Sequence, residues 1–560
     1  MKKIIICIIA SMLLISVTVI SSTGKSNTEN ITKTSDDYSK IVEKFLSKNI
    51  FLSDWSEHKL TASDGSADDN FGISVSIDGN YAVVGAYHDD SGKGSAYVFK
   101  RSGSTWTQEQ KLTASDGNAG DNFGNSVSIN GEYSIVGARY SNSYKGAAYV
   151  FKRSGSSWTQ EQKLTAADGE AWNYFGCSVS IYEEHCIIGA HDDDDNGGAS
   201  GSAYVFIRSG SSWTQEQKLT AADGAAWDQF GVSVSLDGES AIVGAFGDDT
   251  YTGAAYVFKR SGTTWTQEQK LTALDASTNE RFGWSVSINE DSAIIGAYLD
   301  DSGKGSAYVF KRSGTTWTQE QKLTAADGVA GDYFGFCVSI CGDDCSIGAM
   351  NDDNKGSSYM FKRSGSTWAI NQKVTAADGE AGDNFGESIS IYEGYIIIGA
   401  RNDDDNGLNS GSAYVFKELI PDLDCVGSLI WYDVAPGGTV TSDFVLANVG
   451  DPGSELSWEI DSHPEWGTWT IIPSGGTGLT PEMGTVTVNV EVVAPDEKNQ
   501  KFNGSIKIVN SEDANDFDIV PIELNTPRSR LINNNFFLKL FERNPLLNLI
   551  LQKLLGLESK

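Results

Sequence analysis

Two regular series of aspartates run through this sequence, and carboxylates so arranged could bind a cation or transfer protons. In the first series, an aspartate stands seven residues before each of seven Phe-Gly dipeptides: Asp64, Asp116, Asp168, Asp223, Asp275, Asp327 and Asp378. The second series is a pair of adjacent aspartates: Asp89-Asp90, Asp193-Asp194, Asp248-Asp249, Asp300-Asp301, Asp352-Asp353 and Asp403-Asp404. One position in that series has Ser141 and Asn142 instead.

The first series is mostly followed by glycine, and an aspartate before glycine commonly stabilises a turn through its own backbone. The paired series fits either a turn or weak binding of a divalent cation, because adjacent carboxylates repel unless a cation or a lysine such as Lys93 relieves them. The candidate metal ligands are Asp89, Asp90, Asp248, Asp249, Asp300, Asp301, Asp352 and Asp353. Calcium is the candidate ion, although no cofactor is required.

Two of the paired loops are longer than the others and richer in aspartate. They run over Asp192 to Gly201 and Asn402 to Gly411, each three residues longer than its equivalents. Longer loops on a regular scaffold commonly carry function. The predicted ligand-binding residues are Asp192, Asp193, Asp194, Asp195, Asp403, Asp404 and Asp405.

These loops belong to a repeat of about 52 residues, the length of a four-stranded propeller blade. The frame is Phe-Gly, twelve residues and Gly-Ala, and it begins at Phe71, Phe123, Phe175, Phe230, Phe282, Phe334 and Phe385. In the first copy, 74–77 and 81–86 are strand-like, followed by 95–100 and a polar strand through Trp106. The fold class predicted is therefore all-β.

Counting the strands predicts a closed ring. The tryptophan strand occurs at Trp55, Trp106, Trp158, Trp213, Trp265, Trp317 and Trp368, so the first lies before the first Phe-Gly and the last copy has none after it. A ring closes if residues 55–62 supply the fourth strand of the last blade. We therefore predict a seven-bladed β-propeller over residues 53–419. In its outer strands, charged residues such as Glu109 and Lys111 are expected to discourage edge-to-edge pairing.

The strand order also assigns the loops to faces. The link from second to third strand and the link from fourth strand to the next blade emerge on one face, so both aspartate series fall there. Turns with Lys-Arg pairs, such as Lys100-Arg101 and Lys311-Arg312, fall on the opposite face. We expect one acidic and one more basic face.

Phe71-Gly72, Gly85-Ala86 and the Tyr97-Val98-Phe99 strand resemble the FG-GAP repeat, the blade of integrin alpha-subunit propellers. The resemblance implies a propeller used in adhesion or binding. Blades of that family often carry a calcium loop between their first two strands. Here this turn is only Asp78-Gly79-Asn80 in the first copy, too short to surround a cation, so those calcium sites do not carry over.

The segments that flank the propeller differ from it in composition. Residues 1–23 have a basic start and an apolar run, typical of a signal peptide or, alternatively, an uncleaved anchor. Residues 24–52 read as a polar linker. Residues 420–527 predict an immunoglobulin-like sandwich that resembles BACON-type domains, which implies a spacer or a contact domain. Residues 528–560 predict an amphipathic helical tail that contacts a membrane or envelope, or packs on its own domain.

An exported chain could form disulfides among Cys177, Cys186, Cys337, Cys341, Cys345 and Cys425. Cys341 and Cys345 flank a tight turn where a bond across a hairpin could form. The alternative is that the cysteines are buried thiols that fill small core positions.

The net charge of −33, from 75 acidic and 42 basic residues, argues against nucleic acid binding. The five histidines form no repeated constellation. We therefore predict a monomeric extracellular or cell-surface protein, not an enzyme, that binds or adheres to an extracellular protein or glycan through the acidic face. The alternatives are a carbohydrate-active or other hydrolytic enzyme with carboxylates at that face, and a purely structural envelope protein.

Overall fold

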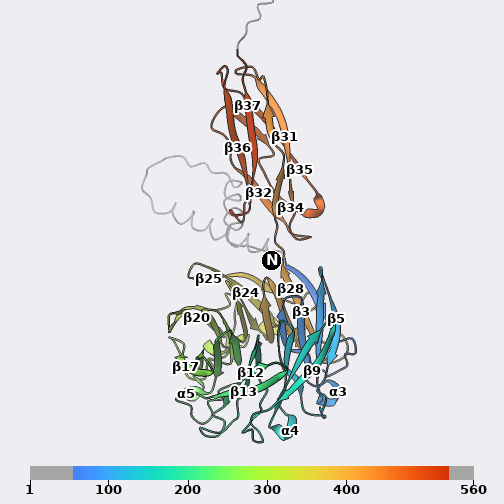
Figure 1. Ribbon diagram of the computed structural model, residues 1–560, viewed down its shortest axis with the longest axis vertical. Coiled ribbons are helices and arrows are strands. Elements are labelled where there is room, and N and C mark those ends of the chain that lie inside the picture. Colours follow the sequence, from blue (N-terminus) through green and yellow to red (C-terminus); the bar gives the residue numbers. More distant parts are fainter. Residues whose placement is uncertain (1–54, 529–560) are drawn as a thin grey trace, which may run out of the picture. The chain divides into compact units, whose positions relative to one another are not determined.

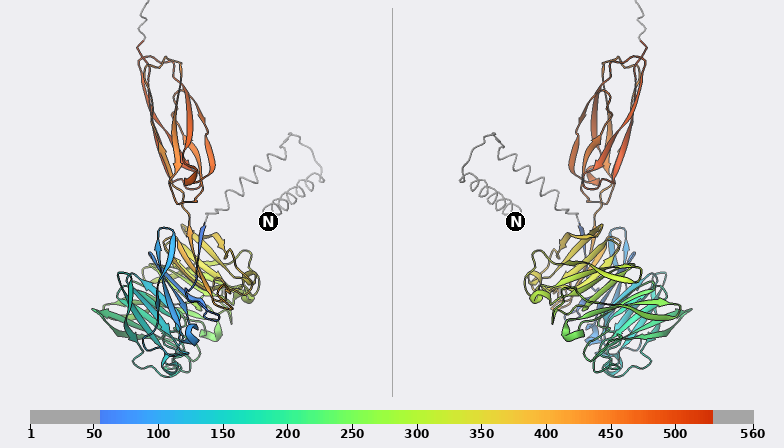
Figure 2. Two further views of the ribbon diagram at one scale, coloured as in Figure 1. Left: turned by 90° about the vertical axis from the view of Figure 1, so that its right-hand side faces the viewer. Right: turned by 90° about the vertical axis from the view of Figure 1, so that its left-hand side faces the viewer.

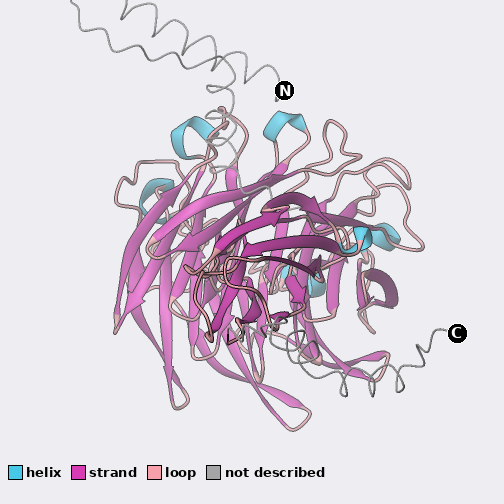
Figure 3. Cartoon of the chain, turned by 90° about the horizontal axis from the view of Figure 1, so that it is seen from above, coloured by secondary structure: helices cyan, strands magenta, loops and turns pink. Residues whose placement is uncertain are grey.

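The first six copies of the repeat each form one four-stranded antiparallel sheet in the computed structural model, which describes residues 55–528. The seventh copy forms such a sheet together with the strand that precedes the first copy. Strands dominate the described residues, and the helical segments among them are short (Figure 3). Seven such sheets, here called blades, make up the propeller. A second region, residues 423–525, forms two further sheets.

The first four blades have the following strands. Blade one contains β2 (Phe71–Asp78), β3 (Tyr81–Ala86), β4 (Ser95–Ser102) and β5 (Thr105–Leu112). Blade two contains β6 (Phe123–Asn130), β7 (Tyr133–Ala138), β8 (Ala147–Ser154) and β9 (Ser157–Leu164). Blade three contains β10 (Val179–Tyr182), β11 (His185–Ala190), β12 (Ser202–Ser209) and β13 (Ser212–Leu219). Blade four contains β14 (Val234–Asp237), β15 (Ser240–Ala245), β16 (Ala254–Ser261) and β17 (Thr264–Leu271).

The last three blades follow the same order until the final strand. Blade five contains β18 (Ser285–Asn289), β19 (Ser292–Ala297), β20 (Ser306–Ser313) and β21 (Thr316–Leu323). Blade six contains β22 (Phe334–Cys341), β23 (Asp344–Ala349), β24 (Ser357–Ser364) and β25 (Thr367–Val374). Blade seven contains β26 (Ser388–Tyr392), β27 (Tyr395–Ala400), β28 (Ser412–Glu418) and β1 (Trp55–Leu60).

The pairing of β1 with β28 closes the ring, and it is the pairing that the strand count predicts. The two strands are antiparallel, with Trp55 opposite Glu418 and Leu60 opposite Ala413. Figure 2 shows the blue start of the described chain beside the orange strand of the last blade. The first strands of consecutive blades, β2, β6, β10, β14, β18, β22 and β26, contact one another around the ring, and β26 contacts β2.

The Phe-Gly and Gly-Ala dipeptides are explained by close approach between neighbouring blades. Gly72 has φ +91°, and a Cβ atom there would lie 2.2 Å from the carbonyl oxygen of Ser412. A Cβ atom at Gly85 would lie 2.0 Å from the carbonyl oxygen of Gly124 in blade two. Only glycine allows the backbones to approach so closely. Phe71 packs edge-on against Tyr97, with ring centroids 5.5 Å apart.

The polar outer strands join adjacent blades. The side-chain amide of Gln110 accepts a hydrogen bond from the Trp158 backbone N–H and donates one to its carbonyl, both at 2.8 Å. The indole N–H of Trp158 donates to Glu109 at 3.2 Å. Glu109 therefore binds the neighbouring blade, a role more specific than the edge protection expected from the sequence.

One face of the propeller carries the links between second and third strands and the links between blades; we call it the loop face. Short helical turns lie there: α3 (Asp89–Gly92), α4 (Ser141–Tyr144), α5 (Asp248–Tyr251), α6 (Asp300–Gly303) and η1 (Asp352–Asn354). Figure 1 shows α3, α4 and α5 together at one end of the propeller. The two kinds of link touch directly, as where the Asn122 backbone N–H donates to the Gly92 carbonyl at 2.9 Å.

The six cysteines among the described residues are free thiols. Cys341 and Cys345 flank a turn, but Cys341 lies opposite Asp344 and Cys345 lies opposite Ile340, and the bond that could have joined them across the hairpin is not seen. Cys345 packs in a core cluster, and burial raises the pKa of its thiol. The alternative of buried thiols therefore describes this cysteine.

The second region has two sheets around one apolar core. One sheet has the order β29 (Leu423–Val426), β31 (Thr439–Asn448), β35 (Val486–Val493) and β33 (Thr468–Ile472). The other has the order β30 (Leu429–Trp431), β37 (Phe517–Asn525), β36 (Lys501–Asn510), β32 (Leu456–Ser462) and β34 (Gly475–Leu479), and η2 (Pro481–Met483) is a single 3-10 turn. Phe444, Val490 and Ile508 are buried in the core. The immunoglobulin-like and BACON-type assignments stay predictions.

The predicted signal peptide or anchor, the linker and the helical tail lie outside the described residues, apart from the tail's first residue, Arg528. Among the helices that the structure describes, none has the length and apolar character needed to cross a membrane.

Candidate functional site

A lysine connects the two aspartate series in the blades of the propeller. In blade one, the Nζ atom of Lys111 lies 2.7 Å from Asp64 in the link between blades and 2.6 Å from Asp89 in α3. The corresponding pairs to the link aspartate are Lys163–Asp116, Lys218–Asp168, Lys270–Asp223, Lys322–Asp275, Lys373–Asp327 and Lys59–Asp378, at 2.6–2.8 Å. We call each such group a lysine cluster.

The lysines also contact the first aspartate of the acidic pair. These ion pairs are Lys218–Asp193, Lys270–Asp248, Lys322–Asp300, Lys373–Asp352 and Lys59–Asp403, at 2.5–3.1 Å. Blade two has Ser141 at this position, so Lys163 binds the link aspartate alone. The sequence pointed to Lys93 as the cation near Asp89, whereas the ammonium group that reaches it belongs to Lys111.

The two aspartates of each pair have different environments. Asp89 is buried and accepts hydrogen bonds from the hydroxyls of Ser95 and Tyr97. Asp90 is exposed and has φ 52°, in the left-handed region. The same division holds for Asp248 and Asp249, Asp300 and Asp301, and Asp352 and Asp353. In each pair, the first aspartate binds the lysine and the second lies in an exposed turn. The two carboxylates of a candidate metal pair therefore do not converge on one point.

The charges of a cluster stabilise one another. Burial opposes ionisation of Asp300, but hydrogen bonds from Lys322 and Ser306 outweigh it and lower the pKa of the carboxyl group. Burial also opposes the charge of Lys322, whose bonds to Asp275 and Asp300 raise its pKa. These groups are ionised near neutral pH and held in place, which makes them poor acids or bases.

The two long loops extend the cluster by one carboxylate. Lys218 lies 2.5 Å from Asp195, and Lys59 lies 2.5 Å from Asp405. One long loop thus brings Asp193 and Asp195 together at Lys218. The other brings Asp403 and Asp405 together at Lys59. The other three candidates do not join them: Asp192 accepts a hydrogen bond from Gln229, Asp404 accepts one from the Asn409 backbone, and Asp194 is exposed.

One cluster has the geometry of a metal site with a lysine at its centre. Oxygens of Asp378, Asp403 and Asp405 lie within 4.8 Å of one another. The Nζ atom of Lys59 is at most 3.0 Å from each of them. A divalent cation would have to displace this ammonium group. Sequence reasoning missed the lysine, although it recurs in all seven copies as reliably as the aspartates.

Exposed apolar side chains of the propeller gather on the loop face. Seven of the eight large hydrophobic residues exposed in residues 55–419 lie in its links: Tyr144, Trp172, Trp227, Tyr251, Leu274, Val329 and Leu408. The eighth, Ile370, lies in an outer strand. Single exposed apolar residues are ordinary, whereas here they are concentrated on one face of the propeller.

The ends of the inner strands at the loop face depart from the repeat. The residues that follow Phe-Gly are Ile73, Asn125, Cys177, Val232, Trp284, Phe336 and Glu387, and those that follow Gly-Ala are Tyr87, Arg139, His191, Phe246, Tyr298, Met350 and Arg401. Arg139 and Arg401 are at these positions, whereas most propeller arginines, such as Arg153, are at the repeated turn of the opposite face. Sequence reasoning missed these positions; their signal is variation within a nearly exact repeat.

Glu387 is the most perturbed carboxyl group of this region. It is 7% exposed, forms an ion pair with Arg401 at 2.9 Å, and its Oε2 atom has no hydrogen-bond partner. Burial, opposed by the charge of Arg401, raises its pKa to about 7. The carboxyl group therefore changes its protonation near neutral pH.

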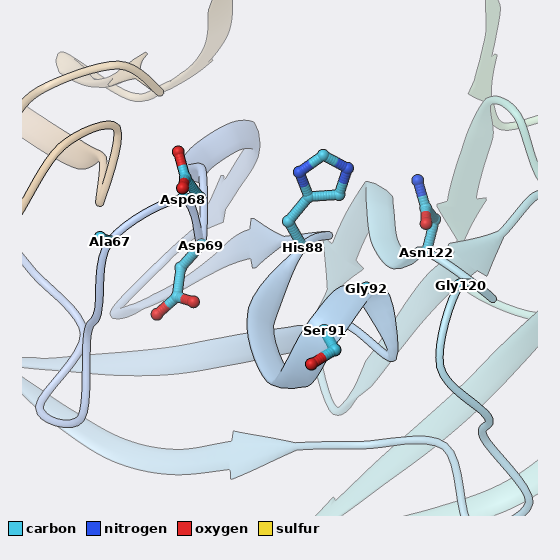
Figure 4. Close-up of a pocket in the computed structure, with 8 residues that line it drawn as sticks. All are labelled: Ala67, Asp68, Asp69, His88, Ser91, Gly92, Gly120 and Asn122. Carbon is cyan, nitrogen blue, oxygen red and sulfur yellow. The ribbon is translucent and has the colours of Figure 1, made fainter.

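A shallow hollow of about 450 Å³ lies between blades one and two on the loop face. Ala67, Asp68, Asp69, His88, Ser91, Gly92, Gly120 and Asn122 line it. Figure 4 shows the side chains of His88 and Asn122 pointing the same way and Asp69 pointing away. Burial lowers the pKa of His88, so its imidazole is neutral at pH 7.

The model of the FG-GAP repeat matches the chain seven times, over residues 55–99, 106–151, 158–206, 213–258, 265–310, 317–361 and 368–416. The chain belongs to the FG-GAP repeat family. Each FG-GAP match starts in the outer strand of one blade and ends in the third strand of the next, so the first match begins in β1 and the last ends in β28. Among curated proteins, none matches the chain.

Proposed function

We propose that this FG-GAP protein is a secreted or cell-surface, non-catalytic binding protein whose loop face binds an extracellular protein or glycan. Propellers of the integrin-alpha type often serve adhesion or binding. The observation that carries the proposal is the concentration of exposed apolar side chains on the loop face. Large exposed apolar groups rimmed by polar residues are typical of interaction surfaces.

The lysine clusters support binding over catalysis. A hydrolytic enzyme needs carboxylates that can reach a substrate and exchange protons. Asp89 is instead buried and bound to Lys111, and the arrangement recurs around the ring. One observation favours the enzyme alternative, namely Glu387, whose pKa of about 7 would suit a general acid.

Binding of the full chain to arrays of glycans and extracellular proteins tests the proposal. A loop-face variant that combines Leu274→Ser, Val329→Ser and Leu408→Ser is expected to lose at least tenfold in affinity for the ligand found. A control variant carries Ser104→Ala, Ser211→Ala and Thr263→Ala at turns of the opposite face and is expected to bind normally. Equal loss in both variants, or hydrolysis of an array component that Glu387→Gln abolishes, contradicts the proposal.

A further inference from the structure

An aromatic ledge crosses the loop face between blades two and three. The rings of Tyr144 in α4 and Trp172 in the following link are stacked, with centroids 4.2 Å apart and planes inclined by 9°. Trp172 is 57% exposed, so Tyr144 supports it from one side while much of the indole faces solvent. The ledge continues through Tyr140, Tyr174 and His191, whose successive ring centroids are 5.6 and 5.4 Å apart.

The backbone at Trp172 shows that folding does not require a tryptophan there. Its φ of 77° lies in the left-handed region, where a large side chain is strained. Three other copies have glycine at this position, Gly120, Gly331 and Gly382, each with positive φ. A strained and exposed aromatic residue at a position suited to glycine points to a role in binding.

An arginine without a carboxylate partner lies at the inner end of the ledge. The guanidinium carbon of Arg139 is 4.8 Å from the centroid of the Tyr140 ring. Its Nε atom is buried without a hydrogen-bond partner, as are those of Arg101, Arg153, Arg208 and Arg363. Arg139 makes no ion pair with the acidic residues among 55–528. Burial lowers the pKa of neighbouring His191; the charge of Asp192 opposes this shift, and the charge of Arg139 adds to it.

One acidic pair of the loop face is missing beside the ledge, while Asp192 remains 3.5 Å from the Nε2 atom of His191. Blade two is the copy in which Ser141 and Asn142 replace the acidic pair. Asp116 of the same blade is bound by Lys163 at 2.7 Å. Without the acidic pair in α4, a negatively charged ligand meets two fewer carboxylates at blade two than at a blade that carries the pair.

We propose that the ledge binds an acidic glycan, with a sugar ring stacked on Trp172 and a uronate carboxylate bound by Arg139. The C–H groups on the face of a pyranose ring are attracted by the negative face of an aromatic ring. An arginine fork matches a carboxylate geometrically and forms a strong charged hydrogen-bond pair with it. The inference rests on the proposed function, because it names the ligand class of the same face.

The test measures binding of the full chain to oligosaccharides of galacturonate, guluronate, mannuronate and glucuronate. A matched probe is methyl-esterified oligogalacturonate, which keeps the sugar and removes the charge. We expect at least one of the four free uronate oligosaccharides to bind. If oligogalacturonate binds, its methyl esterification should weaken binding tenfold or more. Trp172→Ala should weaken binding of the free acid at least tenfold. Arg139→Gln should weaken binding and abolish the preference for the free acid over its ester.

The controls are Tyr432→Ala, which removes an aromatic residue 68% exposed outside the propeller, and Arg281→Gln, which removes another arginine of the loop face. Both are expected to bind as the parent does, with melting curves showing that every variant is folded. The inference is overturned if no uronate oligosaccharide binds, or if Trp172→Ala binds like the parent. Binding to a protein or neutral glycan that the triple loop-face variant loses but Arg139→Gln keeps overturns the inference and leaves the proposed function standing.

Discussion

The ammonium group of Lys59 lies 2.7 Å from the carboxylate of Asp378, a residue 319 positions later in the chain. Lys59 belongs to β1 and Asp378 to the link that leads into blade seven, so this ion pair joins the start of the propeller to its end. The same lysine contacts the buried Asp403 at 3.0 Å. Side chains thus hold the ring closed beside the backbone pairing of β1 with β28.

Replacing this lysine is expected to destabilise the propeller strongly. Lys59→Met leaves three carboxylates together, one of them 5% exposed, and an uncompensated buried charge costs about 3 kcal/mol. Lys163→Met is the matched control, because its single partner, Asp116, is 52% exposed and such pairs contribute less than about 1 kcal/mol. Urea unfolding measures both. Equal losses in the two variants contradict this account of ring closure.

The same variant should create a calcium site. With Lys59→Met, oxygens of Asp378, Asp403 and Asp405 lie within 4.8 Å of one another without the ammonium group between them. Oxygen ligands of this kind bind calcium. We expect millimolar calcium to raise the melting temperature of Lys59→Met more than that of the parent, and chelation to reverse the effect. The lysine does not exclude calcium from this cluster if the parent responds to calcium as strongly as the variant.

The propeller was accessible from the sequence because its signals are local and repeated. The fixed spacing of Phe71-Gly72 and Gly85-Ala86 gives the blade, and the displaced strand at Trp55 gives the ring closure. The place of the acidic loops followed from strand order. Their chemistry did not, because the partner of Asp89 is Lys111, in the outer strand of its blade. A lysine in an outer strand reads from the sequence as a solvent-facing residue.

The aromatic ledge was less accessible for a different reason. Tyr144 and Trp172 stand in separate loops, and only the packing of α4 against the next link brings their rings together. The left-handed backbone at Trp172 also cannot be predicted from the sequence of its own copy. The glycine at the equivalent position of three other copies is the sequence feature that indicates it. The two-sheet region has nine strands, and short ones such as Leu429–Trp431 carry little alternation by which the sequence could reveal them.

Glu387 should make stability depend on pH near neutrality. Its pKa is raised to about 7 from an ordinary value of about 4.3, so the fold favours the protonated form. The stabilisation it contributes is present below pH 4 and is lost as the pH rises through 7. Glu387→Gln mimics the protonated form and is expected to be more stable than the parent at pH 8, by about 1–3 kcal/mol, with the difference disappearing near pH 4.

Urea midpoints of the parent and Glu387→Gln at several pH values measure this difference. Glu239→Gln, at a side chain 63% exposed, is the control and should differ little from the parent at any pH. A Glu387→Gln variant that is less stable than the parent at pH 8 indicates that the ion pair with Arg401 outweighs the burial of the carboxylate.

Replacing the exposed tryptophans by glycine separates strain from packing. Trp227 has φ 74° and is 63% exposed, so Trp227→Gly relieves the left-handed strain and loses few contacts. We expect a gain of about 0.5–1 kcal/mol in unfolding free energy. Trp172→Gly relieves the same strain but loses the stacked ring of Tyr144, which contributes about 0.5–1.5 kcal/mol, so its stability should stay close to that of the parent. Chemical unfolding of the two variants shows whether these tryptophans stabilise the fold. If Trp227→Gly lowers the free energy of unfolding by more than about 1 kcal/mol, the tryptophan contributes to folding and the account of strain is wrong.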